Sequence, residues 1–258
     1  MRVFKNNETS IDYNNTSEGY ISVAYTGDAD KKCKLQIRKD GQMQNFTVQR
    51  DAKAFPLCFW DGRYTAMIAQ QIEGTRYKSL VTLPFDVNLR TPFVPWLNQN
   101  TYCDYGPDST CVRVAAGISR AFSGDVRRIT GIYQWIIGNI EYDYALAKKI
   151  REKNMTWWLP EPDGVIEAGK SICWGYSSLF AAMCRSQGIP CKIVVGPVKG
   201  TGNHAWNEVY SRKPGIVNGL AIQANAWSRL DLTFMDTSRG GAAAFVREDT
   251  NYTAEYYG

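Results

Sequence analysis

Residues 169–196 read GKSICWGYSSLFAAMCRSQGIPCKIVVG, and this stretch carries the clearest structural signals in the chain. From residue 171 to residue 185 the apolar side chains recur at helical spacing, and the following Gly-Ile-Pro supplies the usual stop signals of a helix. The next four residues, KIVV, have the apolar, β-branched composition of a buried strand. The stretch therefore predicts a helix that begins near Cys173 and leads into a strand.

Cys173 falls in the opening turn of this predicted helix. A thiol is a good nucleophile only as a thiolate, and the positive end of a helix dipole favours negative charge on sulfur. The unpaired amides of the same turn, those of Cys173 and Trp174, could also hold the oxyanion of a tetrahedral intermediate. An inert, buried cysteine is the common alternative, so this position alone does not establish a nucleophile.

His204 is the only histidine in the chain, so any acid–base step that needs imidazole at neutral pH must use it. It lies where a glycine-bearing loop, predicted at 196–203, meets a strand predicted at 204–210. Asp231 lies at the end of a third predicted strand, 227–232, and could accept a hydrogen bond from the second imidazole nitrogen. A lone histidine is more often a surface or core residue, and these positions do not exclude that alternative.

The first part of the chain has a different pattern. Cys33, Leu35 and Ile37 alternate with polar residues before the turn Asp40-Gly41, and similar short strands recur to about residue 89. They predict a small β-sandwich at residues 1–90. A proline-bearing stretch at 84–95 marks the boundary, and an amphipathic helix at 126–140 opens an α+β region at 91–258.

Composition excludes several classes of partner. The formal net charge of +5 comes without a long run of Lys and Arg, so we expect no nucleic-acid ligand. No apolar run is long enough to span a membrane, and the first residues lack the core of a secretory signal. No paired CxxC pattern is present and histidine is single, so we expect neither a structural metal nor a cofactor.

Seven cysteines make an odd number, which in a secreted protein suggests one thiol left over after pairing. With Cys173 set aside, six remain that could pair in about 15 ways or stay reduced as small apolar residues. We would examine Cys103 and Cys111 first, because the Gly106-Pro107 turn lies between them. The six are Cys33, Cys58, Cys103, Cys111, Cys184 and Cys191.

Three segments of the sequence resemble the transglutaminase-like superfamily: residues 169–196, NHAWNEV and WSRLDLTF. The resemblance implies a transglutaminase-like (papain-like) cysteine-hydrolase core with Cys173 as nucleophile, His204 as acid–base group and Asp231 as its partner. It extends over the preceding NIEYDYALA and WLPEPDGVI. The N-terminal β-region resembles the domain that precedes this module in secreted or surface-anchored Firmicutes proteins. Two positions depart from the family pattern: Leu232 replaces a proline after Asp231, and Cys191 follows Gly-Ile-Pro.

These features predict thiol-dependent acyl transfer on a protein or peptide amide, with hydrolysis by a cysteine peptidase or amidase preferred. Protein crosslinking by transamidation is the alternative within enzymes, and a catalytically idle surface module that binds a cell-wall or protein ligand is the alternative outside them. A papain-type peptidase has its histidine about 130 or more residues after the cysteine, whereas His204 follows Cys173 much sooner. The resemblance implies a protein that acts outside the cell or on its surface. We then expect its signal or anchor to be missing from this sequence.

Overall fold

The computed structural model describes residues 2–153, 159–237 and 242–258. The chain divides into two compact units, Met1–Thr101 and Tyr102–Gly258. The expected boundary lay after residue 90, and the first unit extends past it to Thr101. We propose that these two units are the two domains of the chain, and each is described by itself.

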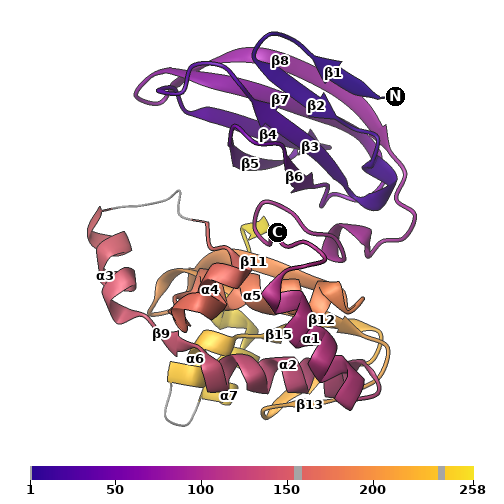
Figure 1. Ribbon diagram of the computed structural model, residues 1–258, viewed down its shortest axis with the longest axis vertical. Coiled ribbons are helices and arrows are strands. Elements are labelled where there is room, and N and C mark those ends of the chain that lie inside the picture. The colour runs from indigo at the N-terminus through magenta and orange to yellow at the C-terminus, as the bar shows by residue number, and fades with distance from the viewer. Residues whose placement is uncertain (1, 154–158, 238–241) are drawn as a thin grey trace. The chain divides into compact units, whose positions relative to one another are not determined.

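The first unit consists of two four-stranded sheets (Figure 1). One has the strand order β1-β2-β3-β6 and the other the order β5-β4-β7-β8, with antiparallel pairing throughout. Their bounds are β1 Val3–Lys5, β2 Thr9–Asp12, β3 Tyr20–Tyr25, β4 Cys33–Lys39, β5 Gln42–Val48, β6 Lys53–Pro56, β7 Gly62–Glu73 and β8 Arg76–Val87, and two short 3-10 helices are η1 Thr16–Glu18 and η2 Val94–Trp96.

Alternation along the strands explains how the two sheets pack. In β4 the odd-numbered apolar residues are buried and the polar residues between them are not, as the sequence predicts. Asp40 and Gly41 both have positive φ, at 48° and 79°, which closes the β4–β5 hairpin with the twist that such turns require. Phe46 of one sheet and Phe55 of the other meet edge to face at 5.2 Å, so the buried faces form a sandwich core.

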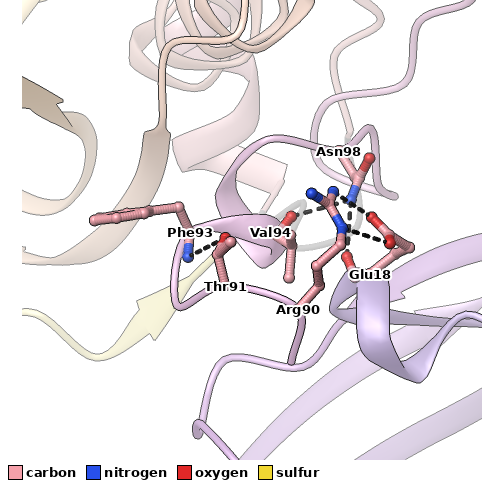
Figure 2. A network of polar contacts seen from close by, with 6 residues as sticks. All are labelled: Glu18, Arg90, Thr91, Phe93, Val94 and Asn98. Carbon is pink, nitrogen blue, oxygen red and sulfur yellow. Dashed lines mark hydrogen bonds and ion pairs between the residues drawn. The ribbon is translucent and has the colours of Figure 1, made fainter. Parts of the chain in front are cut away.

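The segment after β8 is held against the first unit by polar contacts (Figure 2). Arg90 binds the Glu18 carboxylate through both Nε and Nη2, at 2.9 and 2.8 Å. The Asn98 amide donates to the carbonyl oxygens of Glu18 and Val94 at 2.8 and 3.1 Å, and the Phe93 amide donates to Thr91. Because these bonds return the chain to η1, residues 90–98 belong to the first unit although their prolines suggested a linker.

The second unit combines helices with a four-stranded sheet of order β15-β12-β11-β16, which is an α+β arrangement (Figure 1). A parallel pair, β9–β10, and a hairpin, β13–β14, lie outside this sheet. The helices are α1 Thr110–Ala121, α2 Asp125–Asn139, α3 Tyr144–Lys153, α4 Pro162–Ala168, α5 Cys173–Ser186, α6 Leu232–Thr237, α7 Ala242–Arg247 and the 3-10 helix η3 Asp249–Asn251. The strands are β9 Glu141–Tyr142, β10 Lys170–Ser171, β11 Cys191–Val198, β12 Gly202–Ser211, β13 Gly215–Val217, β14 Leu220–Ile222, β15 Ala226–Leu230 and β16 Tyr256–Tyr257.

Helix α5 is the centre of this unit. Every residue from Gly175 to Arg185 is buried, and the helix contacts α1, α2 and α4 as well as strands β11 and β12. Its end has the expected geometry, because Gly188 has a φ of 73° and the Ile189 amide donates to the Cys184 carbonyl at 3.0 Å. The helix and the strand predicted from residues 169–196 are thus confirmed.

Two predictions of local structure are wrong. Residues 196–203 do not form a loop, because β11 continues to Val198 and β12 begins at Gly202, with Gly196 opposite His204 in the ladder. Glycine at 196 serves close packing, since a Cβ there would collide with the Thr253 carbonyl oxygen. The third strand ends at Leu230 rather than at 232, because the next residues begin α6.

Of the two alternatives left open for the other six cysteines, the structure has the reduced one, and all seven cysteines, which lie in the described part of the chain, are thiols. The preferred pair fails because each sulfur faces its own acceptor. The Cys103 thiol donates to the Ser178 carbonyl at 3.6 Å, whereas Cys111 lies against the Asp163 side chain. Burial raises the pKa of Cys103 to about 12 and also raises that of Cys111, so both suit the role of apolar core residues. In residues 2–153, 159–237 and 242–258, no helix is long and apolar enough to cross a membrane.

A pair of glycines tests the contact between η1 and the segment after β8. Gly19 has a φ of 82°, and a Cβ there would lie 2.7 Å from the Pro95 nitrogen, whereas Gly41 has nearly the same φ with open space around it. We expect Gly41→Ala to cost about 1–2 kcal/mol for the left-handed conformation alone. Gly19→Ala should lower the free energy of unfolding by at least about 1 kcal/mol more. Urea unfolding measures both, and equal losses would contradict the contact.

Candidate active site

Cys173 is the first residue of α5 and is partly exposed. No side chain caps this helix end, because the residue before Cys173 is Ile172, so the first-turn amides of Cys173 and Trp174 have no capping side chain. The Ser171 side chain packs closely against the backbone of Gly175, since a Cβ at position 175 would collide with the Ser171 hydroxyl. Glycine at 175 therefore lets β10 lead directly into the helix start and fixes where the thiol is placed.

His204 and Asp231 come from neighbouring strands. His204 is the third residue of β12, and Asp231 directly follows β15, which pairs with β12 through Asn207 and Leu230. The His204 Nε2 and Asp231 Oδ2 atoms lie 2.8 Å apart, and the two side chains are 5% and 0% exposed. Their proximity follows from the antiparallel register, which brings residues distant in sequence to one end of the sheet.

The Asp231 carboxylate accepts two further hydrogen bonds. The Phe234 amide, in the first turn of α6, donates to Oδ1 at 3.1 Å, and the Tyr252 hydroxyl donates to Oδ2 at 2.9 Å. A buried carboxylate is costly unless donors surround it, and here one imidazole, one amide and one hydroxyl do so.

The Cys173 thiol lies near the His204 imidazole and contributes to its charge state. Because Nε2 is taken by Asp231, the nitrogen left for the sulfur is Nδ1. The Phe234 ring packs on the imidazole with 5.0 Å between centroids, and the Trp174 ring packs on Tyr102 at 5.2 Å. The imidazole thus lies between a carboxylate and a sulfur, with its ring plane restrained by an aromatic neighbour.

The charge state of His204 follows from these neighbours. Burial by itself lowers the pKa of an imidazole, but the negative charge and hydrogen bond of Asp231, followed by the Cys173 sulfur, outweigh it. Together they raise the pKa of His204 to about 10. At neutral pH the imidazole therefore carries a proton on each nitrogen.

The structure brings together all three residues singled out in the sequence, Cys173, His204 and Asp231. Sequence reasoning missed Tyr252, because it lies in a polar segment, DTNYT, without periodicity or motif. Only the path of the chain after η3 carries its hydroxyl to Asp231.

Residues 112–232 match the model of the transglutaminase-like superfamily, a segment that includes Cys173, His204 and Asp231. The chain therefore contains a transglutaminase-like superfamily domain.

Similar proteins extend this comparison. The kyphoscoliosis peptidase of Homo sapiens is 37% identical over 97 residues, which cover 33% of this chain and 14% of that protein. Its counterpart in Mus musculus is 29% identical over 189 residues, which cover 69% of this chain and 24% of that protein. The chain thus spans less than a quarter of the length of these relatives. The periplasmic domain of TgpA from Pseudomonas aeruginosa aligns with 90% of this chain and 95% of its own, at 13% identity and a TM-score of 0.38.

Because His204 is the single histidine, its titration can be followed by NMR with one set of imidazole signals. We expect those signals to stay at their protonated positions from pH 6 to beyond about pH 8, since the ordinary midpoint of about 6.5 is raised. Cys173→Ala should lower the midpoint and Asp231→Asn should lower it further, because Asp231 contributes more to the rise. A midpoint near 6.5 in the unchanged protein would contradict the arrangement.

The same raised pKa predicts how stability depends on pH. His204 binds its proton more tightly in the folded chain than in the unfolded one, so its contribution is complete below about pH 6.5 and is lost as pH rises toward about 10. The difference in free energy of unfolding between the unchanged protein and His204→Gln should shrink across this window. Urea titrations at pH 6, 8 and 10 measure the difference, and a value independent of pH would refute the expectation.

Proposed function

We propose that the chain catalyses thiol-dependent acyl transfer on protein or peptide amides through Cys173, His204 and Asp231. The observation that carries this proposal is the position of one imidazole between a buried carboxylate and a partly exposed thiol at a helix start. Nucleophile, base and orienting group in this order are the arrangement that activates a cysteine for attack on a carbonyl. The superfamily match over residues 112–232 supports the same reading.

The reaction has two steps. The Cys173 sulfur has passed its proton to His204, and as a thiolate it attacks the amide carbonyl carbon. The first-turn amides of Cys173 and Trp174 hold the oxyanion that forms. His204 gives a proton to the departing amine as the carbon–nitrogen bond breaks, which leaves a thioester. His204 then takes a proton from the acceptor that attacks the thioester, and the carbon–sulfur bond breaks to return the Cys173 thiolate, while Asp231 keeps the imidazole oriented.

The acceptor decides between hydrolysis and crosslinking. Water as acceptor releases an acid and makes the protein a peptidase or amidase, whereas a lysine amine makes it a transglutaminase. We favour hydrolysis, which is supported by the name peptidase that the human and mouse relatives carry. We also propose that the protein acts outside the cell or at its surface, where a protein or cell-wall component would meet it.

The test is a peptide library incubated with the full chain, with and without an added primary amine, and read by mass spectrometry. Cleavage, deamidation and amine incorporation change a peptide's mass by different amounts. We expect cleavage or deamidation that does not depend on the amine. Cys173→Ala should reduce turnover by a factor of about 10³ or more and leave thermal stability nearly unchanged, because the three groups act as a unit.

Cys58 provides the matched control, since it is also partly exposed but lies in the first unit. Cys58→Ala should keep full turnover. If Cys173→Ala retained half of the turnover, the assignment of the nucleophile would be wrong. If the unchanged chain acted on no peptide yet bound some of them, the idle binding module would replace the enzyme.

A further inference from the structure

We propose that Tyr252 is a positioning residue of this site. Its hydroxyl shares the Asp231 carboxylate with His204 and holds that carboxylate in the orientation that the imidazole needs. This inference rests on the proposed function for its catalytic meaning, although the contact itself does not. The Tyr252 hydroxyl donates to Oδ2 at 2.9 Å, and the His204 Nε2 approaches the same oxygen at 2.8 Å. Tyr252 is therefore a direct neighbour of the bond that orients the imidazole.

Three donors fix the carboxylate of Asp231. The Phe234 amide donates to Oδ1, while His204 of β12 and Tyr252, which directly follows η3, both donate to Oδ2. With both oxygens bound, the carboxylate plane has little freedom to rotate. Without Tyr252 the carboxylate would depend on His204 and one amide, and the orientation of the imidazole would be less well defined.

Tyr252 is itself held in place on several sides. Its ring meets Trp206 edge to face at 5.0 Å and lies 6.0 Å from Phe245, and the Arg229 guanidinium stacks over it at 4.3 Å. Arg229 is fixed in turn by the Val246 carbonyl and by Asp249. Such packing restricts the hydroxyl to one direction, which is what a positioning role requires.

The Tyr252 hydroxyl should lower the pKa of His204, because both groups bind the same carboxylate oxygen. A hydroxyl that donates to Oδ2 takes up part of the carboxylate's negative charge, so less of it acts on the imidazolium. Removing the hydroxyl leaves the charge to His204 and raises the pKa of the imidazole. A stronger phenolic donor at the same place lowers it. A residue that only filled space would do neither.

Several titratable or charged groups surround this cluster and must be considered in any titration. They are Cys173 at the start of α5, Tyr133 of α2, Arg229 of β15, Asp231 after β15, Asp249 of η3 and Tyr252 itself.

The experiment follows the His204 titration by NMR in the Cys173→Ala chain, where the midpoint is lower and easier to reach. Adding Tyr252→Phe should raise the midpoint of the His204 titration by about half a pH unit or more. Replacing Tyr252 with 3-fluorotyrosine, a more acidic phenol that keeps the ring, should lower it. The matched control is Tyr256→Phe, at an exposed tyrosine of β16, and it should leave the midpoint unchanged.

Activity provides the second measurement. With Cys173 restored, Tyr252→Phe should reduce kcat about tenfold and leave KM within about twofold, because orientation of the imidazole is needed in the transition state. A His204 midpoint that moves in neither Tyr252 variant would overturn the proposal, even if the protein lost stability. If the His204 midpoint rises in Tyr252→Phe and falls in the fluorotyrosine protein, but the unchanged chain shows no turnover, the positioning contact is supported and the proposed reaction is refuted. If Tyr252→Phe does not fold, the fluorotyrosine protein alone decides.

Discussion

Burial of α5 is the constraint on which the second unit depends. From Gly175 onward this helix is buried on every side, and β11, β12, α1, α2 and α4 enclose it. Its first turn is the end that reaches solvent, and there Cys173 remains partly exposed beside amides that no side chain caps. The same enclosure makes the other thiols of this unit inert core residues.

A second constraint is the charge of Asp231, which has no exposed surface. An isolated buried carboxylate costs several kcal/mol, so its donors are as much part of the fold as of the site. Its donors are the imidazole of His204 from β12, the amide of Phe234 and the hydroxyl of Tyr252. These hydrogen bonds connect three segments of the chain through one carboxylate. The raised pKa of His204 is the electrostatic consequence of this arrangement.

Predictions from sequence succeeded where the signal was local. The alternation in β4, the turn at Asp40-Gly41 and the limits of α5 each depend on a few consecutive residues. They failed where a distant segment decided the outcome. Glycine at 196 indicated a loop, but the close approach of Thr253 places it in a strand, and the Cys103 and Cys111 thiols turned to partners outside the stretch between them.

Residue order therefore specified the strands around β4, the helix α5 with the strand after it, and the chemical types at the site, because helical and strand periodicity, turn residues and a single histidine can be read from the sequence alone. The resemblance of three short words to a known superfamily indicated which cysteine, histidine and aspartate to combine. Distances and charge states came only from tertiary structure. The imidazole meets Asp231 at 2.8 Å, and Tyr252 joins them, because strand pairing and the path after η3 bring together residues that local rules cannot relate.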